Sequence, residues 1–161
     1  MIPHNRLPHV TEVCANESEV LGLSIIRFVA AGAMTGDAAC WDAAHDCAES
    51  VLGWREGPAL VAAMACLVRA LRRQRRTAFT CLPATCCRVA PDECELLKLL
   101  SLARREDCAD LPVAAARLSG AADGALLAEA ARAAGEALDR AQQRLLPPDG
   151  WVPFGRAASV H

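Results

Sequence analysis

Apolar side chains recur along most of the chain at intervals of three and four residues, the spacing that lines one face of an α-helix. In the first such segment the stripe runs through Leu21, Ile25 and Phe28. Between residues 20 and 34 the only charge is Arg27, and a helix this apolar on most sides is normally the central one of a bundle. The whole pattern predicts helices over residues 18–33, 38–52, 57–76, 91–105, 111–119 and 124–145.

Short polar residues and glycines mark the ends of these segments. Aspartate side chains accept hydrogen bonds from the first free backbone N–H groups of a helix, and glycine takes the left-handed conformation that ends one. The expected N-caps are Asp37, Asp110 and Asp123. The expected helix ends are Gly36, Gly53 and Gly120.

Composition supports the same fold class. Alanine and leucine, both strong helix formers, supply 34 and 20 of the 161 residues. Valine and isoleucine together supply only 14, too few for a protein built on sheets. Since the length is that of one domain, we expect an all-α, single-domain bundle of five to six helices spanning residues 1–161, with an N-terminal arm (1–15) and a C-terminal tail (147–161).

Residues 77–90 form the one long segment inside the domain without a helical period, and loops of this length are often functional. The segment holds three of the nine cysteines, Cys81, Cys86 and Cys87. Thiolates suit soft metals such as zinc, although no two of these cysteines have the two-residue gap of a standard zinc site. Arg88 and the helix start just beyond it would lower a thiol pKa. A thiol-based metal site or redox sensor at Cys81, Cys86 and Cys87 is therefore one functional hypothesis.

The alternative for the cysteines is structural. A free cysteine packs like a small apolar residue and can stand where alanine would in a crowded helical core. Cys40, Cys47, Cys66 and Cys94 fall on or beside apolar stripes, which favours this interpretation.

Catalytic signals are sparse, so an enzyme is the less favoured class. No phosphate loop, nucleophile elbow or paired-histidine metal motif is present. A cysteine nucleophile would need a base, and His45 is the only internal candidate. We expect no catalytic residue and no cofactor other than a soft metal at the loop.

Two charged clusters are expected to be solvated helix faces. Asp42, Asp46 and Glu49 share one face, for which a divalent ion or a basic partner is the alternative. The arginines of residues 69–76 match the dipole at a helix end, and phosphate binding is their alternative. With a net charge of −2, nucleic acid is not expected as a partner.

The segment 124–145 carries leucine and alanine at alternating intervals of four and three, a heptad seam that lets a partner helix approach closely. The tail beyond it contains Trp151 and Phe154, which are apolar for a free end. We therefore expect a non-catalytic interaction or regulatory module, a homodimer or protein-binding protein that uses this helix and tail.

The start of the chain has no apolar run of the kind that a secretory signal needs. The most apolar stretch, residues 20–34, is shorter than the ~20 residues of a membrane span. These observations predict a cytoplasmic protein that does not interact with membranes.

Overall fold

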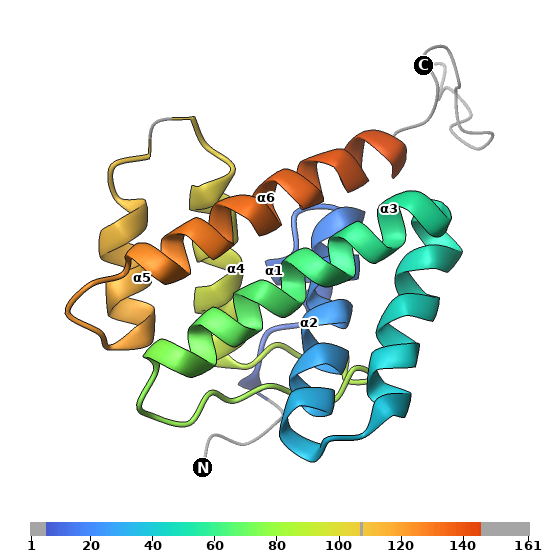
Figure 1. The fold of residues 1–161 in the computed structure, drawn as a ribbon, viewed down its shortest axis with the longest axis horizontal. Helices are drawn as coiled ribbons and strands as arrows, with labels where there is room; N and C mark the ends of the chain where they lie inside the picture. Colours follow the sequence, from blue (N-terminus) through green and yellow to red (C-terminus); the bar gives the residue numbers. More distant parts are fainter. Residues whose placement is uncertain (1–5, 107, 146–161) are drawn as a thin grey trace, which may run out of the picture.

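The computed structural model describes residues 6–106 and 108–145 (Figure 1). Every regular element in these ranges is a helix, which confirms the all-α prediction. The helices are α1 (Val10–Val13), α2 (Glu17–Thr35), α3 (Ala38–Gln74), α4 (Pro91–Ala103), α5 (Leu111–Ser119) and α6 (Ala125–Leu145).

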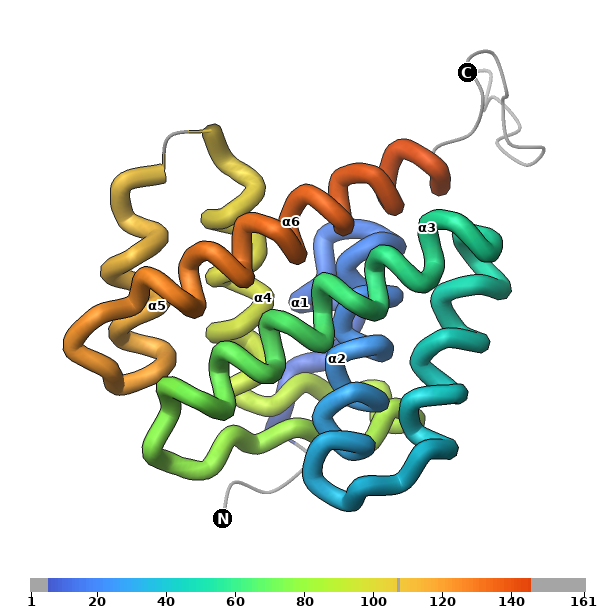
Figure 2. Tube along the Cα trace, in the orientation of Figure 1, coloured from blue at the N-terminus to red at the C-terminus, as the bar shows by residue number. Residues whose placement is uncertain are grey.

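The second half of α3 and α6 run side by side across the molecule, with α2 beneath them and α4 and α5 at one end (Figures 1 and 2). Leucine and isoleucine side chains of all five longer helices meet in one apolar core. Its largest fully buried side chains are Leu23, Ile25, Ile26, Leu60, Met64, Leu67, Leu96, Leu99, Leu100, Leu111, Leu127 and Leu138. The core therefore includes residues from both sides of the 77–90 loop.

Helix α2 is the central helix that its sequence predicts, since it is buried on most sides. Its N-cap is Asn16, whose side chain accepts a hydrogen bond from the Glu19 backbone N–H, and Gly36 ends it with a left-handed φ of 73°. At Gly32 the next helix approaches closely: a Cβ there would lie 2.7 Å from Nε1 of Trp41. Only glycine leaves room for the tryptophan ring.

Helix α3 consists of two helical halves that meet at a kink, which confirms the predicted break after residue 52. Gly53 has non-helical angles (φ 80°, ψ 174°), so the predicted break lies at the right residue. The helix resumes at once, however, and Pro58 lies inside it rather than in its first turn. The two halves meet so tightly that a Cβ on Gly57 would lie 2.8 Å from the backbone nitrogen of Glu49.

The ends of the last three helices lie close to their predicted positions. Asp123 caps α6 by accepting a hydrogen bond from the Ala125 backbone N–H at 2.9 Å, and Gly120 ends α5 with a left-handed φ of 69°. Asp110 occupies the N-cap position of α5 as predicted, but its side chain makes no capping hydrogen bond. Glu93 supplies half of a capping box for α4 by accepting from the Ala90 backbone N–H.

The N-terminal arm is bound to the irregular loop. The backbone N–H of Val10 donates to the Cys87 carbonyl at 2.9 Å, and that of Val89 donates to the Pro8 carbonyl at 3.0 Å. An isolated antiparallel bridge joins His9 to Arg88. The described part of the arm thus docks on the body of the protein. Residues 1–5 and the tail 147–161 lie outside the described residues.

The heptad seam of α6 is filled from within the chain. Its leucines and alanines are buried against α3, with further contacts to α2, α4 and α5. The buried seam residues are Leu127, Ala131, Ala134, Leu138 and Ala141. Within the described residues this seam is occupied by α3 of the same chain. The homo-oligomer or protein partner expected through this helix and the tail stays a prediction.

Two helices reach the length and hydropathy of a membrane span. They are α2, with 61% of its most apolar window buried inside the fold, and α3, with 39% buried. The core helix of a soluble protein meets the same criteria, so the predictions of a cytoplasmic protein without membrane contacts stay predictions.

Candidate functional site

The 77–90 loop is organised around a buried ion pair between α2 and α4. Arg27 donates from Nε to Oε1 of Glu93 at 2.8 Å and from Nη2 to Oε2 at 2.9 Å. Burial opposes a charged guanidinium, but the hydrogen bond and negative charge of Glu93 raise the pKa of Arg27 above its ordinary value. The same guanidinium donates to the backbone carbonyls of Cys86 and Arg88, so it holds the second half of the loop.

Glu93 serves the first half of the loop in the same way. Its carboxylate accepts from the backbone N–H of Leu82 at 3.0 Å and from that of Ala90 at 2.8 Å. The Cys81 thiol also lies within hydrogen-bond reach, 3.5 Å from Oε1. One fully buried carboxylate therefore satisfies an arginine, two backbone N–H groups and a thiol.

A second arginine, Arg75 at the C-terminal end of α3, holds the start of the loop. It donates to Asp92 at 2.9 Å, to the Thr77 hydroxyl at 3.1 Å and to the Ala78 carbonyl at 3.2 Å. Its guanidinium also lies 5.4 Å from the ring centroid of Phe79, a cation–π distance. With two arginine–carboxylate pairs at its ends, the loop has a fixed backbone even though it lacks regular structure.

The predicted activation of the loop thiols is wrong for Cys81. Burial, followed by the charge and hydrogen bond of Glu93, raises the pKa of this thiol to about 12. The sulfur therefore stays protonated at neutral pH, and a protonated thiol is a poor nucleophile and a poor metal ligand. Sequence proximity to Arg88 gives the wrong direction, because the charge with the largest effect on the pKa of this thiol is the Glu93 carboxylate, 3.5 Å from the sulfur.

The other two loop cysteines contribute backbone groups to the fold. The Cys86 carbonyl accepts from Arg27 and the Cys87 carbonyl accepts from Val10, while the Cys87 side chain is exposed. Within residues 6–106 and 108–145, no group of three or more His, Cys, Asp or Glu side chains could hold a metal ion. The metal site at Cys81, Cys86 and Cys87 stays a prediction that the geometry does not support.

Several of the remaining cysteines fit the structural interpretation. All nine are free thiols. Burial is the largest cause that raises the pKa of Cys14 to about 11 and that raises the pKa of Cys47 and Cys94. These three side chains pack in or against the apolar core, as small apolar residues do.

His45, the only internal candidate for a catalytic base, lies on the first half of α3. Its Nδ1 is 3.8 Å from the carboxylate of Glu49, and both side chains are 43% exposed. Among the described residues it makes no hydrogen bond to any cysteine. The structure thus does not assemble the thiol–imidazole pair that a cysteine nucleophile needs.

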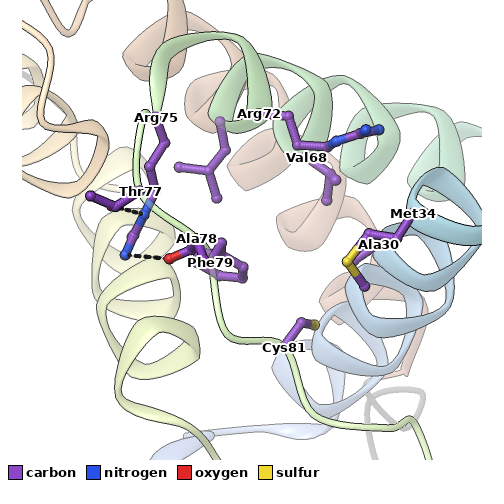
Figure 3. Close-up of a pocket in the computed structure, with 10 residues that line it drawn as sticks. Ala30, Met34, Val68, Arg72, Arg75, Thr77, Ala78, Phe79 and Cys81 are labelled. Atoms are coloured by element: carbon purple, nitrogen blue, oxygen red, sulfur yellow. Dashed lines mark hydrogen bonds between the residues drawn. The ribbon is translucent and has the colours of Figure 1, made fainter.

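An apolar pocket of about 260 Å³ opens between α2, the end of α3 and the start of the loop (Figure 3). Its walls include Ala30 and Met34 from α2, Val68 from α3, and Phe79 from the loop. The Cys81 sulfur lies at the same end of the pocket as Met34 in this view. The loop that the sequence singled out therefore forms one wall of a small cavity.

The kink of α3 exposes apolar side chains on another part of the surface. Trp54, the residue after Gly53, is 75% exposed and Val51 is 49% exposed. The guanidinium of Arg55 lies 5.4 Å from the centroid of the Trp54 ring. We call Val51, Trp54 and Arg55 the α3 corner.

Three acidic residues of the first half of α3 are exposed, as expected for a solvated face. They are Asp42, Asp46 and Glu49.

Sequence reasoning missed the Arg27–Glu93 pair, although one signal for it was visible. A single arginine in an otherwise apolar central helix needs a buried counter-charge, but 66 positions separate it from its partner.

No protein-family model, no curated protein and no solved structure matches the chain.

Proposed function

We propose that this protein is a non-catalytic interaction module that binds a protein segment through the α3 corner. The observation that carries the proposal is Trp54, a large apolar side chain that is 75% exposed on a helical scaffold. Tryptophan and arginine are the side chains most enriched among residues that dominate binding energy at interfaces. At the α3 corner the two lie together, with Arg55 over the Trp54 ring.

The corner is held in place by the backbone beneath it. Gly53 sets the direction of the second half of α3, and Gly57 lets the two halves approach within van der Waals contact. Leu52, between the exposed residues, is buried in the core and anchors the corner. Since the backbone on both sides of the corner is helical, little backbone freedom would be lost on binding, and an exposed tryptophan here is a favourable anchor.

Among residues 42–55 the exposed acidic side chains outnumber the one exposed basic side chain, Arg55, and this balance favours a basic partner. The acids are Asp42, Asp46 and Glu49, all on the first half of α3. A basic segment with an apolar side chain for Trp54 would complement both features. We therefore propose a cationic amphipathic segment of another protein as the occupant.

The alternative function, a thiol-based metal site or redox sensor, has less structural support than the α3 corner. Burial and Glu93 keep Cys81 protonated, and the three loop cysteines are used through their backbone carbonyls or packing. Interaction through an exposed anchor is the better supported of the two functions.

Titration calorimetry with two designed helical peptides tests the proposal. One peptide has lysine and leucine on opposite faces, and the other has glutamate in place of lysine. We expect the lysine peptide to bind and the glutamate peptide to bind at least tenfold more weakly. Trp54→Ala should weaken the lysine peptide about tenfold or more, the range for a binding hot spot. Val113→Ala is the matched control, because Val113 is 69% exposed on α5.

Three outcomes contradict the proposal. Equal binding of both peptides would remove the charge argument, and unchanged binding by Trp54→Ala would remove the anchor. A protein that light scattering finds at twice 17.0 kDa, and at 17.0 kDa after Trp54→Ala, would show that the corner binds a second copy instead.

A further inference from the structure

We propose that the pocket beside the loop binds a small apolar carboxylate, with Arg72 as the counter-ion of its anionic group. This ligand site is separate from the α3 corner and does not depend on it. The pocket is bounded by Ala30 and Met34, by Val68, and by Phe79 of the loop (Figure 3). Such walls favour an apolar ligand body, since apolar enclosures with a few polar groups at the rim are typical of small-molecule sites.

The two arginines that line the pocket have different roles. Arg75 is fully engaged: its guanidinium binds Asp92, Thr77 and the Ala78 carbonyl. Arg72 is exposed and, among the described residues, forms no hydrogen bond or ion pair. In Figure 3 its guanidinium lies on the Met34 side of the pocket, away from Arg75. The rim therefore carries one arginine whose charge is not neutralised by any residue that the structure describes.

The charges nearest the pocket favour an anion over a cation or a neutral molecule. Asp92, the acid that faces this end of the loop, is already neutralised by Arg75 and by the Thr80 backbone N–H. Arg69, Arg73 and Arg76, on the exposed side of the same helix end, add positive potential without lining the cavity. A guanidinium at the rim pairs well with a carboxylate, because its planar donors match the two oxygens.

The volume limits the ligand to a small body. The pocket volume of about 260 Å³ suits a small ligand body. We choose octanoate as the probe, because it joins a short apolar chain for the pocket to a carboxylate for the rim. The Cys81 thiol, which stays protonated, adds a weakly polar, uncharged surface to the wall.

The methionine side chains offer a direct measurement of occupancy. Met34 lines the pocket, whereas Met64 is fully buried in the core and does not. In protein labelled with ¹³C at the methionine methyl groups, we expect octanoate to shift the Met34 resonance in a saturable way and to leave Met64 nearly unchanged. Because the chain has three methionines, the variants Met34→Leu and Met64→Leu together assign the two signals.

Matched ligands and variants distinguish the contribution of the apolar pocket to binding from that of the Arg72 charge. We expect octanoate to bind about tenfold more tightly than 1-octanol or octylammonium. Arg72→Gln should remove this preference while leaving 1-octanol binding unchanged. Arg69→Gln, which alters an exposed arginine outside the cavity, should reduce octanoate affinity far less than Arg72→Gln does and should leave 1-octanol binding unchanged. Ala30→Leu, which fills the cavity, should abolish the Met34 shift.

Each alternative result overturns a stated part of the proposal. No shift of Met34 up to the solubility of octanoate would show that the cavity is not a binding site. Equal affinities for octanoate and 1-octanol, or an unchanged octanoate affinity in Arg72→Gln, would show that Arg72 is not the counter-ion. Equal shifts of Met34 and Met64 would show general binding to the fold.

Discussion

The guanidinium of Arg27 and the carboxylate of Glu93 form a two-point ion pair inside the fold, with nitrogen–oxygen distances of 2.8 Å and 2.9 Å. The two side chains are 2% and 0% exposed. Each partner also binds backbone groups of the loop between α3 and α4, so the pair connects the central helix to the segment that lines the pocket. The loop conformation therefore depends on residues that lie outside it.

Removal of one partner is expected to be costly. Glu93→Gln leaves the Arg27 charge buried without a counter-charge and should lower the free energy of unfolding by about 3–5 kcal/mol, the cost of breaking a buried pair. Urea unfolding of the single variants and of the double variant Arg27→Met, Glu93→Gln measures the coupling. In the double variant the two losses should not add, because neither charge remains unpaired.

The exposed pair between Lys98 and Glu95 is the matched control, with a nitrogen–oxygen distance of 2.7 Å. Surface pairs contribute little to stability, so Glu95→Gln should leave the unfolding curve unchanged. A Glu93→Gln protein as stable as the wild type would show that the buried pair does not organise the loop.

Local chemistry explains why the helix ends were predictable. Gly36 and Gly120 take left-handed angles, and Asp37 and Asp123 accept hydrogen bonds from backbone N–H groups two residues ahead. These devices act within about one turn of the chain. The helix ends can therefore be predicted from neighbouring residues in the sequence alone.

Contacts between distant segments were not predictable in the same way. The apolar face of α6 was identified correctly, but periodicity shows only that a face is buried and not which helix covers it. Along the sequence the positive residue near Cys81 is Arg88, whereas in the fold the Cys81 sulfur contacts Glu93. The pocket likewise arises from residues of α2, α3 and the loop, which only the fold brings together.

The Cys81 thiol is expected to make stability fall at alkaline pH. In the unfolded chain a thiol loses its proton near pH 9.0, whereas the folded protein holds the pKa of Cys81 at about 12. Between these values the native state binds more protons than the unfolded state, so the free energy of unfolding decreases as pH rises. Below pH 9.0 this contribution to stability is fully present.

Urea unfolding under reducing conditions, at several pH values from about 8 to about 10.5, measures how the free energy of unfolding changes with pH. This range brackets the pKa of a free thiol. Cys81→Ser, which keeps a donor for Glu93 but does not titrate there, should show a shallower decline than the wild type. Parallel declines would contradict the proposed protonation of Cys81. Alkylation followed by mass spectrometry should also modify the exposed Cys87 before Cys81.

Two neighbouring alanines of α6, one inside the buried seam and one outside it, are expected to respond differently to the same substitution. Ala134 is fully buried against the rest of the chain, whereas Ala133 is exposed. Ala134→Glu places an unpaired carboxylate in the core and should lower the free energy of unfolding by more than about 3 kcal/mol. Ala133→Glu should leave stability nearly unchanged. Thermal unfolding followed by circular dichroism measures both, and a well-folded Ala134→Glu protein with a halved mass would instead place the seam between subunits.

Gly53 and Gly36 provide a test of the α3 kink that depends on backbone conformation alone. A Cβ would meet no atom within 4 Å at either position, so steric crowding does not distinguish them. Gly36 has φ 73° and ψ 10°, the left-handed region that asparagine tolerates, whereas Gly53 has φ 80° and ψ 174°, a region almost restricted to glycine. Gly53→Asn should therefore lower the free energy of unfolding by about 1–3 kcal/mol.

Gly36→Asn should cost less than about 1 kcal/mol, because the substituted residue keeps a conformation that its side chain can stabilise. Urea unfolding of the two variants beside the wild type gives the comparison directly. Equal losses of unfolding free energy in the two variants would mean that a side chain at residue 53 causes no additional backbone strain. The expected difference would show that the direction of α3 after residue 53, and with it the position of Trp54, depends on a conformation that only glycine adopts at low cost.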